Sequence, residues 1–180
     1  GRVRTVSLCI SPERTEVRYD KIHLFDVQVS DAVGGYQESK FFEPGTDVVV
    51  AKTPFGNIGL MVCYDLRFPE LALTLRARGA NILTAPAAFT YTTGQMHWQL
   101  LLQARAMDSQ SIVLGAAQQG WHGEKRQTWG HAAATNSRGQ VLDLILNPGA
   151  QLITVPFDLA EQVQIRESMP LMQHRKLVQF

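Results

Sequence analysis

The sequence predicts a single α/β domain built on a mixed sheet. Strand-like and helix-like segments alternate through the middle of the chain, and hairpin-like pairs of strands lie toward both ends. The chain has 180 residues, of which 45% are hydrophobic, so it can bury a sizeable core and is not generally disordered. No repeat or linker indicates a second domain. We therefore expect one domain over residues 1–180.

The first half of the chain favours strands. An early hairpin is predicted because two strand-like stretches flank the turn around Pro12. Two further strands are joined through Pro54 and Gly56, which are typical turn residues. The loop predicted between these pairs spans residues 30–35. The four expected strands are residues 4–10, 16–19, 47–51 and 58–62.

The second half adds three helices. Pro69 is typical of a first helical turn, Gly79 of a helix end, and Asp158 of a helix N-cap. In the middle helix, one apolar stripe is predicted at 3–4 spacing, formed by Leu100, Leu101, Ala104 and Met107. The expected helices are residues 70–78, 94–107 and 159–167. The expected strands are residues 82–85, 111–117, 132–135, 141–145 and 151–155.

The balance of charges excludes some classes of partner. The net charge is +1, so no strong field attracts nucleic acid or an anionic membrane, and no apolar run is long enough to cross a bilayer. Two cysteines, Cys9 and Cys63, are too few for a disulfide framework, and a reducing, cytoplasmic location fits them. Cys9 lies in an apolar stretch that favours the core of a strand.

Cys63 is the residue whose surroundings say most about chemistry. An apolar run leads into it, three polar residues follow, and Pro69 then opens a helix. A thiol on a tight strand-to-helix turn points toward solvent, beside backbone amides that can receive an oxyanion. A helix N-terminus also lowers the pKa of a cysteine. Cys63 is therefore a candidate nucleophile, and the alternative is an ordinary buried cysteine.

The functional roles of several other side chains cannot be assigned from their immediate neighbours in the sequence. Lys21 ends a strand among apolar residues, but the residues alone favour a surface lysine there, and Glu38 reads as a solvated loop residue. The histidines show no metal-ligand spacing, so we expect no metal. Trp121 and Trp129 flank a charged loop, which is either a hairpin tip in solvent or the rim of a pocket.

Seven short motifs nevertheless follow one another in a specific order. In order and spacing they resemble the nitrilase superfamily of carbon–nitrogen hydrolases, and most of all its Nit-type amidase branch. The motifs are residues 19–24, Glu38-Ser39, residues 59–70, residues 86–89, Thr93-Gly94 with His97-Trp98, residues 104–106 and residues 129–131.

This resemblance implies a site and a reaction. Cys63 matches the nucleophile, Lys21 the catalytic lysine, and Glu38 a supporting glutamate. The amide of Tyr64 would join Lys21 around the oxyanion, and Phe89 belongs to a segment that shapes the pocket. The implied activity is hydrolysis of a small linear amide through a cysteine thioester, with release of ammonia and without a cofactor.

The resemblance also implies an architecture: a four-layer αββα sandwich that forms homodimers through its helices. The family's general-base glutamate comes from a strand well before the lysine, and neither Glu13 nor Glu16 has its sequence context. We therefore expect the N-terminal portion of the domain, with its opening strands and helices, to be missing. Such a chain would be poorly active and poorly soluble. The alternative is an interaction module of the same shape that is catalytically impaired; an unrelated cysteine hydrolase is less favoured because no Cys–His pairing is evident.

Overall fold

The computed structural model describes residues 1–13, 16–29 and 33–177, so residues 30–32 of the predicted loop lie outside the described part. In chain order the strands are β1 (Val6–Ile10), β2 (Glu16–Asp20), β3 (Asp26–Gln28), β4 (Gly35–Gln37), β5 (Val50–Thr53), β6 (Gly56–Leu60), β7 (Ile82–Thr84), β8 (Ile112–Gly115), β9 (Gln119–His122), β10 (Arg126–Trp129), β11 (Ala133–Thr135) and β12 (Val141–Leu144). The helices are the 3₁₀ turns η1 (Glu38–Lys40) and η2 (Cys63–Arg67), and α1 (Pro69–Ala77), α2 (Tyr91–Ser109), α3 (Leu159–Ser168) and α4 (Leu171–His174).

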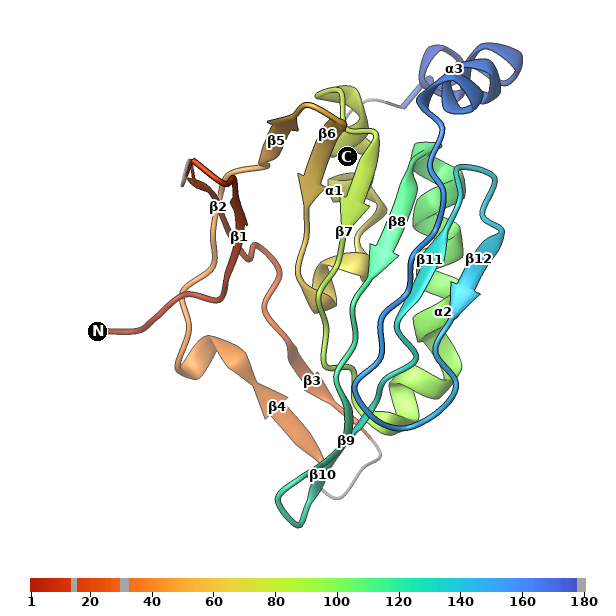
Figure 1. The fold of residues 1–180 in the computed structure, drawn as a ribbon. Helices are drawn as coiled ribbons and strands as arrows, with labels where there is room; N and C mark the ends of the chain where they lie inside the picture. Colours follow the sequence, from red (N-terminus) through yellow and green to blue (C-terminus); the bar gives the residue numbers. More distant parts are fainter. Residues whose placement is uncertain (14–15, 30–32, 178–180) are drawn as a thin grey trace.

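A mixed six-stranded sheet forms the centre of the molecule, in the order β12-β11-β8-β7-β6-β5 (Figure 1). Strands β6, β7 and β8 are parallel to one another, whereas β5, β11 and β12 pair antiparallel. The predicted mixed α/β class is therefore confirmed. Because β6, β7 and β8 run in one direction, the segments that follow them leave the sheet at the same edge.

Helices α1 and α2 cover one face of this sheet (Figure 1). Two glycines allow them to approach closely. A Cβ on Gly115 would lie 2.7 Å from Trp98 of α2, and a Cβ on Gly59 would lie 2.7 Å from Leu83 and 3.2 Å from Leu75 of α1. Trp98 and Leu75 are fully buried, so the densest part of the core lies between the sheet and these helices.

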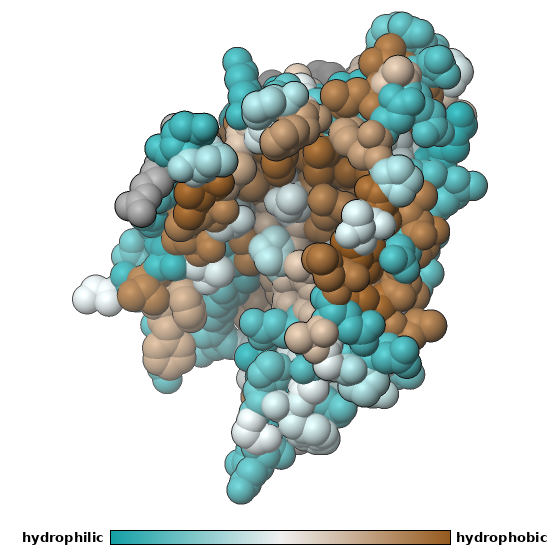
Figure 2. Space-filling model, in the orientation of Figure 1, coloured by the Kyte–Doolittle hydropathy of each residue, from teal (hydrophilic) through white to brown (hydrophobic). Residues whose placement is uncertain are grey.

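The other face of the sheet is hollow and apolar (Figure 2). Leu114 of β8 and Leu142 of β12 are exposed, and in the described residues no second sheet packs over them. The remaining strands form separate two-stranded hairpins, β1–β2, β3–β4 and β9–β10. The four-layer sandwich expected from the resemblance therefore stays a prediction.

The apolar stripe predicted on the middle helix was wrong. Leu100 and Met107 are 64% and 54% exposed, and the helix instead buries Trp98, Leu102 and Ala106. These residues also follow the 3–4 spacing, so periodicity alone could not distinguish the two faces. Packing against the sheet selected the face with the large indole ring.

The strand predicted over residues 151–155 is also absent. No strand partner lies beside this segment in the described structure, and Leu152 is 90% exposed. An alternating apolar pattern without a neighbouring strand does not make a ladder. The segment instead crosses in front of the sheet and leads to α3 (Figure 1).

Several helix ends agree with the sequence, whereas the strand predicted over residues 47–51 lies at 50–53, and strands β3, β4, β9 and β10 were not predicted. Helix α1 begins at Pro69 and ends before Gly79, whose φ of +93° favours glycine. Asp158 caps α3 by accepting a hydrogen bond of 2.7 Å from the amide of Ala160. In the described residues, no helix is long and apolar enough to span a bilayer. Cys9 of β1 is partly buried against the core, as expected.

Substitution of Gly115 by alanine should destabilise the fold. The new methyl group would overlap Trp98 and Leu102, which have no room to move, and overpacking of this kind costs about 1–3 kcal/mol. The measurement is the free energy of unfolding in urea. Gly35→Ala is the matched control, because its added Cβ meets only the flexible end of Gln28. Equal losses in the two variants would contradict the packing described for Gly115.

Candidate active site

A cavity of about 910 Å³ opens where the parallel strands end. Its walls follow β6, β7 and β8, and the opposite side comes from the end of β2 and from the β4–η1 region. All five residues selected from the sequence line this one cavity: Cys63, Lys21, Glu38, Tyr64 and Phe89. The structure thus brings together residues from four separate segments of the chain.

Cys63 lies at the bend where β6 gives way to η2. Its φ of +50° is in the left-handed region, which is unusual for a residue other than glycine and is typical of strained turns at functional sites. Its amide donates to the carbonyl of Pro86 at 2.9 Å. The sequence predicted a tight turn between the strand and the helix, and the structure forms it as the 3₁₀ turn η2 before Pro69. The side chain is partly exposed to the cavity.

The buried carboxylate of Asp65 holds this bend in place. One oxygen accepts from the Tyr19 hydroxyl at 2.7 Å and from the Val62 amide at 2.8 Å. The other accepts from the His23 amide at 3.1 Å and lies 2.8 Å from its Nδ1. Asp65 therefore ties the end of β2 to the residue before Cys63. Burial and the nearby Asp65 charge raise the pKa of Tyr19, which keeps its hydroxyl protonated as a donor.

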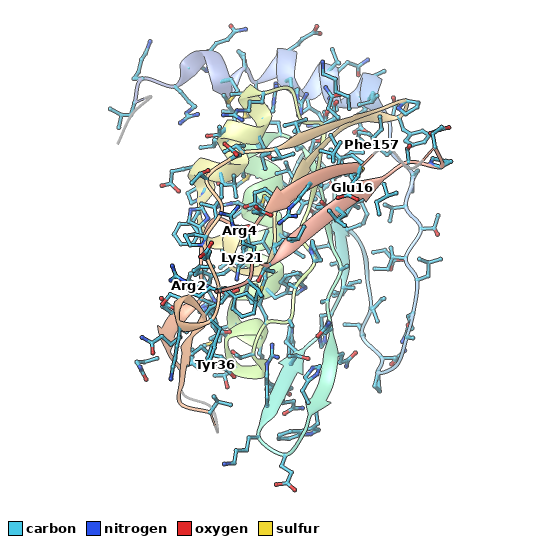
Figure 3. The ribbon with its side chains drawn as sticks, turned by 90° about the vertical axis from the view of Figure 1, so that its left-hand side faces the viewer. Arg2, Arg4, Glu16, Lys21, Tyr36 and Phe157 are labelled. Carbon is cyan, nitrogen blue, oxygen red and sulfur yellow. The ribbon has the colours of Figure 1, made fainter. Side chains whose placement is uncertain are left out.

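Lys21 is 4% exposed, so the surface lysine favoured by the residues alone was wrong. Its Nζ donates to Oε2 of Glu38 at 2.5 Å, and its backbone amide donates to the carbonyl of Thr5 at 2.9 Å. Figure 3 shows Lys21 at the end of the β1–β2 hairpin, between Arg4 and Tyr36 in that view. The cost of burying an ammonium is offset by this pairing.

Glu38 is not a solvated loop residue either, because it begins η1 and faces inward. Its Oε2 also accepts from the Phe25 amide at 2.7 Å, and its Oε1 accepts from the Thr5 hydroxyl at 3.2 Å. Three donors therefore hold the carboxylate in one orientation. Glu38 in turn fixes the ammonium group of Lys21 at the cavity wall.

The surroundings of Cys63 have opposing effects on the pKa of its thiol. Burial raises its pKa above the ordinary value, whereas a hydrogen bond with the Ala88 backbone and the charge of Lys21 lower it. Burial dominates, so the lowering expected from the helix start does not prevail. The thiol is predominantly neutral at pH 7 in this structure.

Aromatic rings build the walls beside the thiol. The Tyr64 ring packs edge-on against Phe25 and Phe68, at centroid distances of 5.0 and 5.4 Å. Phe89 packs edge-on against Trp98, at 5.0 Å. These contacts restrict the rings. The backbone amide of Tyr64 lies directly after Cys63 at the start of η2, where amides lack acceptors within the helix.

Two arginines that line the cavity were not among the site residues selected from the sequence. The Arg67 guanidinium lies 5.3 Å from the Phe89 ring and 3.3 Å from Nδ1 of His97, and Arg126 reaches in from the β9–β10 hairpin. The charged loop was predicted to be either a hairpin tip in solvent or the rim of a pocket. It is both, since Trp121 is exposed while Arg126 lines the cavity. Arg67 lies within the motif of residues 59–70, and Arg126 belongs to the charged loop between Trp121 and Trp129, so both stand in segments that the sequence had already singled out.

Side chains that could bind a metal ion were also considered. Across the described residues, no group of three or more His, Cys, Asp and Glu side chains is arranged to hold an ion. His97 faces Arg67, while Trp98 is buried and donates its indole N–H to the carbonyl of His131 at 2.7 Å.

The comparisons with known proteins identify the family. A profile described as "Carbon-nitrogen hydrolase" matches residues 3–167. The chain therefore belongs to the carbon–nitrogen hydrolase family of the nitrilase superfamily. Within it, the chain groups with the branch of the deaminated glutathione amidases and the NitFhit proteins.

Three relatives illustrate this placement. A deaminated glutathione amidase from Yersinia enterocolitica is 47% identical over 164 residues, which are 91% of this chain and 57% of the relative. A NitFhit fusion protein from Drosophila melanogaster is 43% identical over 88% of this chain and 34% of its own length. The crystal structure of the C. elegans NitFhit protein superposes with a TM-score of 0.86 and 37% identity, covering 97% of this chain and 42% of that one. The chain thus spans about half the length of such relatives.

Replacement of Asp65 by asparagine should loosen the site and the fold together. An amide offers one acceptor oxygen where the carboxylate offers two, so at least one buried donor loses its partner, at a cost of about 1–3 kcal/mol. Urea unfolding measures this loss. Asp143→Asn, at an exposed position on β12, is the control. If both variants unfold at the same urea concentration as the parent chain, Asp65 does not hold the bend.

The alkylation rate of Cys63 should increase with pH well above neutrality. Burial favours the neutral thiol, and the thiolate that reacts with iodoacetamide forms only as the pH approaches the raised pKa. Lys21→Met should move the midpoint higher still, because the Lys21 charge lowers that pKa. The rates are measured in a Cys9→Ser background. A midpoint below the ordinary thiol value, about 8.5, would contradict this reading.

Proposed function

We propose that this chain carries the nucleophilic half of an amidase site, in which Cys63 attacks the carbonyl carbon of a small amide. The observation that supports this most directly is the geometry around Cys63. A strained bend presents the thiol to a cavity whose wall holds an ammonium group fixed by Glu38. The relatives named deaminated glutathione amidases support the same reaction class.

The proposed reaction has two steps, formation of a thioester on Cys63 and its hydrolysis by water. In the first, the Cys63 sulfur bonds to the carbonyl carbon, Lys21 and the Tyr64 amide donate to the oxyanion, and the C–N bond breaks. The thiol proton ends on the departing nitrogen, which leaves as ammonia or an amine. In the second, water adds to the thioester, the C–S bond breaks, and the thiol is restored with a carboxylic acid as product. No cofactor takes part.

The substrate is proposed to carry a carboxylate on its acyl portion. Arg67 follows Cys63 by one turn, its guanidinium faces the cavity, and no salt bridge to it exists within the described part of the chain. A planar guanidinium matches a carboxylate with two hydrogen bonds. Contact with His97 and the Phe89 ring would hold it in position for that purpose.

A second candidate function is binding without turnover. Glu38 and Asp65 are the carboxylates whose charges act on Cys63, and each is fully engaged by hydrogen bonds. Neither is free to take the thiol proton. A chain with this arrangement alone would bind amides in the cavity and hydrolyse them slowly, because a missing general base costs about 10²–10⁴ in rate.

We also propose that the chain forms a homodimer and is located in the cytoplasm. Met96, Leu100 and Met107 expose an apolar face on α2, next to α1. A second copy is the partner that would bury this face on both sides of a two-fold axis.

Glutaramate, a five-carbon monoamide with one carboxylate, is the first substrate to test. We expect slow ammonia release by the chain, and a fall of about 10³-fold or more with Cys63→Ser, since removal of a nucleophile leaves only binding contributions. Cys9→Ser is the control and should retain the activity. Binding of glutaramate without any Cys63-dependent ammonia would reject the amidase and favour the binding module.

A further inference from the structure

His23 lies beside the site, but the proposed reaction gives it no role. Its imidazole Nδ1 lies 2.8 Å from Oδ1 of Asp65, and its backbone amide donates to the same oxygen at 3.1 Å. A carboxylate oxygen only accepts hydrogen bonds, so Nδ1 carries a proton and donates. The Asp65 side chain is fully buried, whereas that of His23 is 26% exposed. His23 thus donates twice to the carboxylate that holds the Cys63 bend.

The same ring is also stacked on the end of the turn that begins at Cys63. It lies flat on Phe68, with 3.7 Å between the ring centroids and an angle of 6° between the ring planes. Phe68 directly follows η2, and its amide donates to the carbonyl of Asp65 at 3.1 Å. Two contacts at different points of the turn therefore fix both the position and the tilt of the imidazole.

His23 belongs to the segment that carries the lysine. Residues 21–25 form neither helix nor strand, so their position depends on individual contacts. Lys21 begins this segment, and Phe25 at its end meets η2 through an edge contact between rings. His23, in the middle, makes hydrogen bonds to η2. Its side chain therefore connects the segment of the lysine to the turn of the nucleophile by a directional contact.

We propose that His23 is a positioning residue, which keeps the Lys21 ammonium at a fixed distance from the Cys63 sulfur. It is not among the residues that line the cavity, so it acts through Asp65 and the segment it shares with Lys21 rather than on a substrate. This rests on the proposed function, in which the lysine and the cysteine act on one carbonyl group. Loss of the side-chain hydrogen bond would let the segment shift, and the effect of a charge falls with distance.

The test measures the effect of the Lys21 charge on the thiol, without any turnover. Iodoacetamide alkylation of Cys63 is followed against pH in the Cys9→Ser background. Lys21→Met raises the midpoint there, because the Lys21 charge lowers the pKa of the thiol. In a His23→Leu chain, the same Lys21→Met change should raise the midpoint by about half as much or less, since residues that act together give non-additive effects.

Two further variants separate the contacts of the ring. His23→Asn can place an N–H near the position of Nδ1, and it should restore the full effect of Lys21→Met. His23→Phe keeps a ring on Phe68 but has no donor for Asp65, so the effect should stay reduced. His174→Leu, at an exposed position on α4, is the matched control and should leave the effect at its parent size.

Urea unfolding of each variant distinguishes positioning from a purely structural role. A less stable His23→Leu chain in which Lys21→Met still has its full effect would overturn the proposal. Where His23→Leu does not fold, His23→Asn and His23→Phe decide, and equal effects of Lys21→Met in these two would also overturn it. A reduced Lys21 effect in His23→Leu, together with no Cys63-dependent ammonia from glutaramate, would retain the positioning role and reject the amidase.

Discussion

One buried carboxylate, that of Asp65, determines how the site is assembled. Cys63 follows a strand of the central sheet, whereas Lys21 follows a hairpin that is not part of that sheet. Asp65 accepts hydrogen bonds from both segments, through Val62 on one side and Tyr19 with His23 on the other. A charged group with no exposure is stable only when its lone pairs are occupied, so these donors must stay in place. The separation of thiol and ammonium is thereby set by a third residue that reacts with neither.

The same logic connects Glu38 to Lys21. Glu38 begins a short turn after β4 and accepts hydrogen bonds from the amide of Phe25 and from the Lys21 ammonium, so the β3–β4 region holds Lys21 in position. The Glu38 carboxylate offsets the loss of water around the buried Lys21 side chain. Its field acts on the Cys63 thiol against the effect of burial. The paired charges of Lys21 and Glu38 are thus held at fixed positions in the wall of the cavity that Cys63 lines.

The sequence predicted the local features well and the long-range ones poorly. Cys63 at a bend before Pro69 follows from neighbouring residues alone, and so do the caps at Gly79 and Asp158. The burial of Lys21 does not, because its partner Glu38 is 17 residues away and reaches it through a separate hairpin. Asp65 drew no attention for the same reason, since its partners Tyr19 and His23 lie 46 and 42 positions earlier.

The wrong prediction for the buried face of helix α2 has a related cause. Helix α2 offers two faces with similar spacing, and only the sheet decides that the Trp98 face turns inward. The resemblance to a family supplied what the local pattern lacked, namely that the lysine, glutamate and cysteine motifs belong to one site.

Three segments of the cavity wall each continue a different parallel strand: Cys63 after β6, Phe89 in the segment after β7, and Gln118 after β8. Backbone hydrogen bonds join these segments to one another, because the amide of Cys63 donates to Pro86 and the amide of Gln118 donates to Ala87. Because these contacts use backbone atoms, side chains on one segment can be exchanged without loss of the hydrogen bonds that join it to the next. The bend at Cys63 and the side chains that line the rest of the cavity can therefore vary separately.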